Sequence, residues 1–365
     1  MPETQPRRLS SALERAGSWF LHSGIQEKNG GTARYYRSGP ANNATISTEI
    51  TGYACGVYLY LYDKSGDRAY RDAAVRAARF LADKAWDAKL SLFPFEVPAK
   101  GEPPCQLAYF FDSGIVARGL LQVWRATGDR KFLDAAAATG RSMISAFVQS
   151  GEIHPIVRLP EKLPPPFEPR WSARPGCYQL KAALAWHELH EAAGDEAFLD
   201  AWEECLDRSL RSHESFLPGA AGQERVMDRL HAYCYFLEGL LPCLDRQPCA
   251  RALTSGLDRV AHFLRQIAPV FERSDVYAQL LRLRVLGAGA HALQRPAAER
   301  EAVTLDGFQI HSTDPRQHGG FYFGRKVTGY LPHVSPVATG FAIQALELWR
   351  EHGEGRTTFN WRDLV

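Results

Sequence analysis

Three stretches of the sequence follow the same plan, and the short link inside each stretch is the most constraining feature of the chain. Each stretch has a mainly apolar segment, a link that contains Gly-Asp, and then a more one-sided, alanine-rich segment. Glycine readily adopts the left-handed conformation that ends a helix, and aspartate is a preferred cap for the next helix. The three links, Gly66-Asp67, Gly128-Asp129 and Gly194-Asp195, therefore predict three helical hairpins.

The hairpin pattern continues less regularly to the end of the sequence. A fourth pair and the start of a fifth follow, and a last apolar helix has its natural partner in an N-terminal helix at about residues 9–23. A helix that is apolar on nearly all sides belongs inside a protein, whereas a one-sided helix belongs outside. The pattern predicts six inner helices, near Thr48–Tyr62, Asp112–Thr127, Gly176–Ala193, Met227–Leu244, Asp275–Gly287 and Val334–Glu351.

Six alternations of inner and outer helices are typical of an all-α (α/α)6 toroid, in which one ring of helices surrounds another. An open superhelical solenoid follows the same packing logic and is the alternative. The number of hairpins, the unequal lengths of the inserts and the absence of a polar cap on the last helix favour a closed ring. No segment has the composition of a linker, so we expect one domain over residues 1–365.

The composition argues against several classes of function. The chain is 45% hydrophobic, and its formal net charge is +2, from 43 basic and 41 acidic residues. This balance gives no electrostatic reason to expect a nucleic-acid or membrane partner, and we expect neither a signal peptide nor a membrane span. The seven cysteines are scattered without metal-ligand spacing, which indicates reduced core thiols in a cytoplasmic protein and no metal site. The sequence has no nucleotide or metal signature, so we expect no cofactor.

The loops of such a toroid differ between its two ends. Every inner helix begins at the same end, and the segments that arrive there are rich in aromatic and charged residues, whereas the links at the other end are short turns. Long loops on one face of a rigid scaffold usually carry the functional site. Aromatic rings stack on sugar faces, fixed polar groups bind hydroxyls, and arginine binds carboxylates. The loop composition therefore predicts a site for a sugar, in particular an anionic one.

Acidic residues at the starts of the inner helices are the leading catalytic candidates. An aspartate at such a position often only caps its helix, but Glu49 follows Ser47 and Thr48, which are better caps. The candidates for catalysis, led by the first two, are Glu49, Asp112, Asp228 and His231. The candidates for substrate binding are Arg34, Tyr36, Tyr53, Trp171, Arg174, Tyr178, Asp275, Tyr277, Gln317, His318, Arg325 and His333. The segments at this end of the ring also contain Tyr35, Arg37, Phe95, Glu96, Tyr109, His154, Tyr235, Arg273, Gln279, Phe321 and Tyr322.

With these repeats and loop residues, the chain resembles the six-hairpin, (α/α)6-barrel carbohydrate enzymes. That group includes unsaturated glucuronyl hydrolases, several polysaccharide lyases, N-acylglucosamine epimerases and the helical domain of glucuronyl epimerases. In the glucuronyl hydrolases, two acidic residues at the starts of successive inner helices form the working pair, and Glu49 and Asp112 match that placement by position, although the surrounding residues do not match closely. The epimerases rely on inner-ring histidines, with which His231 and His333 compare loosely. Toroidal prenyltransferases and terpene cyclases share the ring shape, but the acidic DxDD motif of the cyclases is absent.

The leading hypothesis is a glycoside hydrolase for a uronic-acid-containing or otherwise anionic glycan. One carboxyl group would protonate the glycosidic bond while the other, ionised, would activate water or stabilise positive charge. The first alternative is a polysaccharide lyase or uronyl epimerase that uses a Tyr or His base. The remaining alternatives are a non-catalytic toroid that binds a glycan or a protein, and an isoprenoid-type cyclase. The expected partner is a small-molecule or oligosaccharide substrate.

Overall fold

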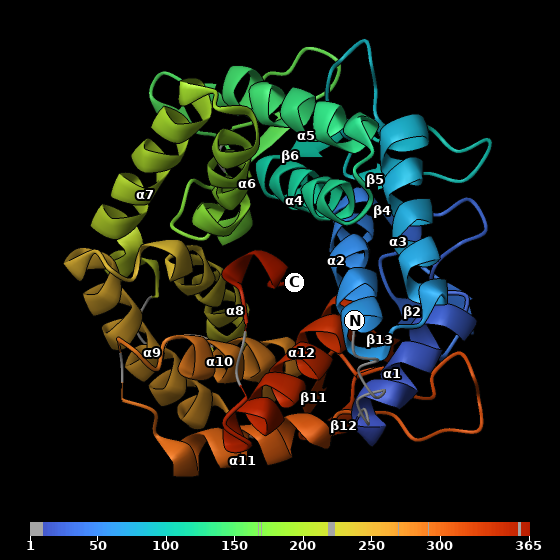
Figure 1. Ribbon diagram of the computed structural model, residues 1–365, viewed down its shortest axis with the longest axis vertical. Helices are drawn as coiled ribbons and strands as arrows, with labels where there is room; N and C mark the ends of the chain where they lie inside the picture. Colours follow the sequence, from blue (N-terminus) through green and yellow to red (C-terminus); the bar gives the residue numbers. More distant parts are fainter. Residues whose placement is uncertain are drawn as a thin grey trace, which may run out of the picture.

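The chain forms two concentric rings of helices (Figure 1). The computed structural model describes residues 10–166, 168, 170–217, 223–268, 270–290, 292–356 and 359–365. Within these ranges twelve α-helices alternate along the chain between the outer and the inner ring. The predicted (α/α)6 toroid is therefore confirmed.

The inner ring is closed. Each inner helix packs against the next one, and the last inner helix packs against the first, which excludes the open solenoid. The inner helices are α2 (Thr48–Ser65), α4 (Phe110–Thr127), α6 (Gln179–Ala193), α8 (Gln223–Gly239), α10 (Ser274–Leu286) and α12 (Pro336–Gly353).

The outer helices are one-sided, as predicted. In α3, for example, Tyr70, Ala73 and Ala77 are buried, and the helix packs against α2 and α4 of the inner ring. The N-terminal helix α1 packs against α12 and completes the sixth hairpin. The outer helices are α1 (Ser11–His22), α3 (Arg68–Phe80), α5 (Arg130–Ser142), α7 (Glu196–Phe216), α9 (Gln247–Ile267) and α11 (Arg295–Asp306).

The fourth inner helix ends earlier than the sequence pattern predicts. The prediction extended it to residue 244, but α8 ends at Gly239 and a separate 3-10 turn follows at Leu241–Cys243. Pro242 lies in this turn. Because proline lacks a backbone N–H and its ring clashes with the preceding turn, it cannot continue an α-helix.

The turns at one end of the ring have the helix-ending glycines and the capping aspartates that the Gly-Asp links predict. Gly66, Gly128 and Gly194 end their helices in the left-handed conformation. The aspartate after each glycine accepts a hydrogen bond from the backbone N–H two residues later. At each of these short turns the chain reverses its direction between the two ends of the ring. Every inner helix therefore begins at the opposite end.

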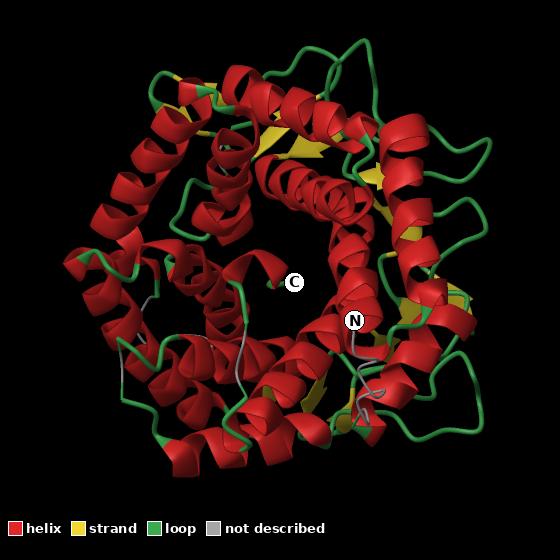
Figure 2. Ribbon diagram, in the orientation of Figure 1, coloured by secondary structure: helices red, strands yellow, loops and turns green. Residues whose placement is uncertain are grey.

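The opposite end carries the longer loops, which pair into small antiparallel sheets between the helices (Figure 2). The sheet orders are β1-β4-β5, β10-β11-β12, β13-β2-β3, β6-β9 and β7-β8. The pairing of β13 with β2 joins the loop before the last inner helix to the loop before the first. The strands are β1 (Thr32–Ala33), β2 (Tyr36–Arg37), β3 (Asn42–Asn43), β4 (Ile46–Ser47), β5 (Glu96–Val97), β6 (Leu107–Tyr109), β7 (Val148–Gln149), β8 (Glu152–Ile153), β9 (Ile156–Arg158), β10 (Phe271–Arg273), β11 (Gly324–Lys326), β12 (Gly329–Tyr330) and β13 (His333–Val334).

The last described segment, residues 359–365, enters the centre of the ring, where Figure 1 places the C-terminus. Val365 is 3% exposed. Side chains of the inner helices, among them Gln122, Lys181 and Gln344, donate hydrogen bonds to backbone carbonyls of this segment. The centre of the ring is therefore filled by the chain itself.

Two further sequence predictions concern the cysteines and membranes. All seven cysteines are free thiols, and six of them are buried, in agreement with the prediction of core thiols. Among the helices of the described ranges, none has both the length and the apolar character that crossing a membrane requires.

The close contact between α2 and α4 depends on paired glycines and gives a stability prediction. A Cβ atom at Gly119 would overlap with the backbone carbonyl of Gly52 on the neighbouring helix. We expect Gly119→Ala to lower the free energy of unfolding by about 1–3 kcal/mol, because the two helices must move apart. Gly353→Ala is the control, since Gly353 is also helical but has open space around it. Urea unfolding of both variants checks this, and equal stabilities would contradict it.

Candidate active site

The two leading acidic candidates lie at the starts of neighbouring inner helices. Glu49 is the second residue of α2, whose cap is Ser47, and the Ser47 hydroxyl accepts a hydrogen bond from the Ile50 N–H. Asp112 is the third residue of α4, whose N-cap position is held by Tyr109. Neither acid occupies the capping position of its helix, so a capping role does not account for their placement.

Burial and mutual repulsion change the acidity of this pair. Burial raises the pKa of Asp112 well above its usual range, the charge of Glu49 raises it further, and Arg34 opposes the rise. Burial also raises the pKa of Glu49 from 4.5 to about 7, again opposed by Arg34. Burial therefore favours the protonated form of Asp112, and Glu49 is close to its midpoint at neutral pH.

A second polar cluster comes from α8 and α10. The Nδ1 atom of His231 lies 2.9 Å from Oε1 of Gln279 and 3.4 Å from Oδ2 of Asp275. Two acceptors around Nδ1 favour the tautomer that is protonated there, which leaves Nε2 able to accept a proton. Burial lowers the pKa of His231 to about 4, although the charge of Asp275 opposes this. The imidazole is therefore neutral at pH 7, as a general base must be.

Arg273 neutralises the two aspartates of this second cluster. Its guanidinium lies 3.0 and 2.6 Å from the two carboxylate oxygens of Asp275, and 2.7 Å from Oδ1 of Asp228. Although burial raises it, the pKa of Asp275 remains below its usual range because Arg273 stabilises the carboxylate. No group of three or more His, Cys, Asp or Glu side chains in the described ranges is arranged to hold a metal ion.

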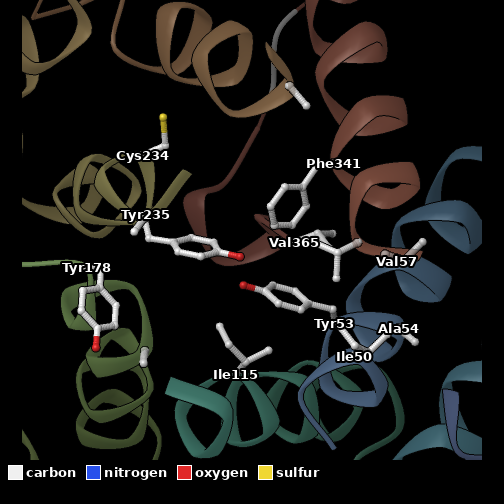
Figure 3. Packing of buried hydrophobic residues seen from close by; sticks show 14 of the residues in the cluster. Ile50, Tyr53, Ala54, Val57, Ile115, Tyr178, Cys234, Tyr235, Phe341 and Val365 are labelled. Atoms are coloured by element: carbon white, nitrogen blue, oxygen red, sulfur yellow. The ribbon is translucent and has the colours of Figure 1, made fainter. Parts of the chain in front are cut away.

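Four aromatic side chains, which we call the aromatic floor, join the two clusters: Tyr53, Phe111, Tyr235 and Phe341. The ring of Tyr235 lies 4.4 Å from the His231 imidazole and 4.6 Å from the ring of Phe111, which precedes Asp112. The phenol oxygens of Tyr53 and Tyr235 point toward each other (Figure 3). Burial raises the pKa of both phenols, and the charge of Glu49 adds to the rise. The floor therefore lies close to both clusters.

Some buried polar atoms around the floor lack a hydrogen-bond partner among the described residues. They are Oδ2 of Asp112 and Nε2 of Gln279, while the Tyr53 hydroxyl has only that of Tyr235 facing it (Figure 3). Buried polar atoms in folded proteins nearly always have a partner, so each exception needs an explanation. A carboxyl oxygen, a hydroxyl and an amide donor around one floor are groups that the hydroxyls of a bound sugar can satisfy.

Arg34 is the predicted binding arginine whose charge acts on the acid pair. Its side chain is 47% exposed, and its Nη1 lies 3.3 Å from Oε1 of Glu96. The guanidinium lies 5.0 Å from the centre of the Phe95 ring, and Phe95 in turn packs against Tyr109. Arg34 therefore stands at the edge of the site, where it is partly free to bind a ligand.

The proline-rich insert before α6 adds aromatic groups to the same rim. The rings of Trp171 and Tyr178 meet edge to face at 5.1 Å, and Tyr178 lies 6.3 Å from Phe111 of the floor. The Tyr178 hydroxyl donates to the backbone carbonyl of Arg174, so it stabilises the insert. The Arg174 side chain binds the carbonyl of Glu168 within the insert. Trp171 and Tyr178 thus extend the floor, whereas Arg174 serves its own loop.

Two predicted binding residues, Tyr277 and Arg325, are not brought together with the acids. The Tyr277 hydroxyl lies 2.6 Å from Glu272, and Nε of Arg325 lies 2.5 Å from the same carboxylate. Tyr277 also lines a cleft formed by α9 and α11 of the outer ring. Successive side chains of a strand point to opposite faces. In β10, the Arg273 side chain points to the cluster of Asp275 and Asp228. Glu272 points to the other face, where it binds Arg325 and Tyr277.

Four other predicted residues contribute to the loops around the first and last inner helices. Tyr36 is 2% exposed. Gln317 and His318 both form hydrogen bonds within their own loop. His333 packs against Tyr35, where β13 pairs with β2, and burial together with the charge of Arg37 lowers the pKa of His333. These contacts stabilise the rim, and none of them reaches the acid pair.

Tyr235, Arg273 and Gln279 are the site residues to which the sequence pattern assigned no role. A helical signal could have found two of them, because residues four apart share one helix face. Tyr235 follows His231 by four residues, and Gln279 follows Asp275 by four. The position of Arg273 depends instead on β10, the strand that precedes α10. The sequence does not show which face of this strand points to the site.

Comparison with known proteins supports the fold. No protein-family model matches the sequence, and neither does any curated protein. The structure is similar to a sugar epimerase from a ruminal bacterium (13% identity, 93% of this chain and 97% of that chain, TM-score 0.70). It is also similar to cellobiose 2-epimerase from Spirochaeta thermophila (15% identity, 93% of this chain and 94% of that chain, TM-score 0.71). A third similar structure is D-mannose isomerase (10% identity, 95% of this chain and 100% of that chain, TM-score 0.69). At these identities the likeness establishes a shared (α/α)6 toroid alone.

The raised pKa of Glu49 gives a prediction about stability and pH. Unfolded Glu49 loses its proton at the ordinary pKa of 4.5, whereas the folded protein keeps it until about pH 7. The folded state therefore binds more protons in this window, and stability is lost as the pH rises. We expect the free energy of unfolding of the wild type, relative to that of Glu49→Gln, to fall across this window. Urea unfolding in a series of buffers measures this, and a constant difference would refute it.

Proposed function

We propose that the protein is a carbohydrate-active enzyme that hydrolyses glycosidic bonds. The observation that carries the proposal is the acid pair of Glu49 and Asp112, which come from adjacent inner helices and influence each other's acidity. Hydrolysis of a glycosidic bond needs one protonated and one ionised carboxyl group. Pairs of titratable groups whose surroundings separate their acidities are suited to this division of roles.

The surroundings of each carboxyl group indicate its role. Asp112 is 5% exposed and is expected to be protonated, so it is the group that donates a proton to the glycosidic oxygen. Glu49 is less buried, and the charge of Arg34 favours its ionised form, so it acts as the base. Glu49 takes a proton from water as the water oxygen attacks the anomeric carbon. The glycosidic bond breaks, the leaving sugar keeps the proton of Asp112, and bulk solvent restores both groups.

Substrate binding is assigned to the aromatic floor and the atoms around it. A sugar ring has apolar faces that can pack on Tyr235 and Phe111, while its hydroxyls pair with Tyr53 and Gln279. For a uronic acid, the partly exposed guanidinium of Arg34 is suited to bind the carboxylate. The fold is compatible with such a substrate, because the similar structures bear the names of sugar epimerases and of a mannose isomerase. Fold likeness alone does not define an activity.

Removal of the proton donor tests the hydrolase proposal. We expect Asp112→Asn to lower kcat on a glycoside by about a thousandfold, because an amide cannot supply the proton, while the fold is retained. Asp129→Asn is the control: Asp129 caps α5 at the turn end of the ring, and asparagine also caps helices. The assay measures reducing sugar released from a panel of neutral and uronic-acid oligosaccharides. Turnover by Asp112→Asn at the wild-type rate would disprove the role of Asp112.

A second candidate activity is epimerisation or isomerisation of a sugar. The observation that favours it is the neutral His231, whose Nδ1 is held by Gln279 and Asp275 and whose Nε2 can act as a base. Such a base removes the proton from the carbon next to a carbonyl or carboxylate. His231 lies beside Tyr235, so it can reach the same sugar that the floor binds.

The product formed in heavy water separates the two activities. Hydrolysis adds one water molecule across the cleaved bond and leaves the carbon-bound hydrogens unchanged. Epimerisation or isomerisation leaves the number of sugar units unchanged and introduces deuterium at carbon. Mass spectrometry of the products distinguishes them, and we expect His231→Asn to abolish deuterium incorporation. A wild-type rate of incorporation in His231→Asn would exclude His231 as the base.

A further inference from the structure

A layer of buried charge lies directly beneath the aromatic floor. Lys181 of α6 and Arg282 of α10 both have a fully buried side chain and both bind the carboxylate of Glu238, at 2.7 and 2.5 Å. Both also donate to the Val365 carbonyl, at 3.2 and 3.1 Å. Gln344 of α12 binds Arg282 as well, at 2.9 Å. The layer therefore links four inner helices and the C-terminal segment under the site.

Lys181 is the member of this layer that lies close to two rings of the floor. Its Nζ atom is 5.8 Å from the ring centres of both Tyr235 and Phe341. An ammonium group within about 6 Å of an aromatic ring is attracted to it, and the attraction increases when water is excluded. Figure 3 shows the side chains of Tyr53, Tyr235 and Phe341 gathered around Val365. The charge of Lys181 thus acts on the side chains that support the proposed substrate position.

Lys181 and Arg282 share the same buried acceptors. Both bind the carboxylate of Glu238, and both donate to an oxygen of Val365, the last residue of the sequence. Burying a second cation is costly, because an ammonium group loses its hydration. Burial accordingly lowers the pKa of Lys181 to about 7, although Glu238 opposes this. A residue that is costly to bury and adjacent to a functional site is a candidate for a role in that site.

We propose that Lys181 is a positioning residue of the site, which orients Tyr235 and Phe341 from below and so fixes the Tyr235 hydroxyl against that of Tyr53. The role in catalysis rests on the proposed function, whereas the positioning itself does not. Tyr235 touches His231 on one side and Phe111, next to Asp112, on the other. A shift of Tyr235 therefore moves both clusters relative to a bound sugar.

The first experiment observes the tyrosines directly. The full-length protein is labelled with fluorotyrosine, and the fluorine NMR signals of Tyr53, Tyr60 and Tyr235 are assigned by substitution with phenylalanine. We expect Lys181→Met to shift the signals of Tyr53 and Tyr235, because the cation that orients the Tyr235 ring is lost. Lys181→Gln, which keeps a hydrogen-bond donor for Glu238, serves if the first variant does not fold. Unchanged Tyr53 and Tyr235 signals in the folded variant would overturn the proposal.

Lys64 provides a matched control. It is a partly buried lysine of the inner ring, it binds Glu351 at 2.6 Å, and its Nζ lies 5.4 Å from the ring centre of Tyr60. Lys64 and Tyr53 are eleven residues apart on α2, which places them about 16 Å apart along the helix axis. We expect Lys64→Met to shift the Tyr60 signal and to leave those of Tyr53 and Tyr235 in place. Shifts of all three signals in both variants would indicate a general loosening of the ring and would also overturn the proposal.

The second experiment measures the catalytic constants of the two lysine variants. With a glycan that the wild type converts, we expect Lys181→Met to lower kcat about tenfold with little change in KM, and Lys64→Met to stay within about twofold of wild type. A purely structural loss would instead lower the fraction of active enzyme and leave kcat per active site unchanged. If no glycan is converted by the wild type, the proposed function fails, while the NMR result still decides whether Lys181 positions the floor. A normal kcat in Lys181→Met would show that the positioning does not serve catalysis.

Discussion

A ring of six inner helices encloses a central space, and the rest of the structure depends on how that space is filled. The last described residues of the chain enter it, and fully buried charges surround them. An unpaired charge at such a depth is strongly destabilising. Glu188 and Glu238 are both completely buried, and each is bound by two basic side chains from the inner helices. These ion pairs link the inner helices at the centre of the ring, and they lie beneath the candidate site.

Above these ion pairs, carboxyl groups at nearly equivalent positions have opposite acid–base properties. Asp112 and Asp275 both lie in the first turn of an inner helix, and both are buried. Burial raises the pKa of both groups. At Asp275 the charge of Arg273 outweighs this rise, whereas at Asp112 the charge of Glu49 adds to it. Two aspartates in the first turns of inner helices thus have pKa values shifted in opposite directions.

The fold could be predicted because it depends on contacts between residues that are close together in the sequence. The Gly-Asp links specify their turns through contacts between adjacent residues, and the apolar pattern of each helix assigns it to the inner or outer ring. For the site, the same reasoning placed Glu49 and Asp112 at the loop end of the ring, since both lie in the first turn of an inner helix, whereas His231 is the ninth residue of α8. It also assigned Arg325 to the site. In the structure β11 pairs with β10, and Arg325 binds Glu272 rather than the acid pair.

By itself, the sequence determined the helical hairpins, their alternation between two rings, and the end of the ring at which polar and aromatic loops gather. Only the tertiary structure decided which of those side chains meet, that Arg273 neutralises Asp275, and that Lys181 lies under Tyr235. The physical reason is the range of the interactions involved. Turns, caps and helix faces depend on residues a few positions apart. Protonation states and orphaned polar atoms depend instead on distances between elements that are far apart in the chain, and those distances exist only once the ring has closed.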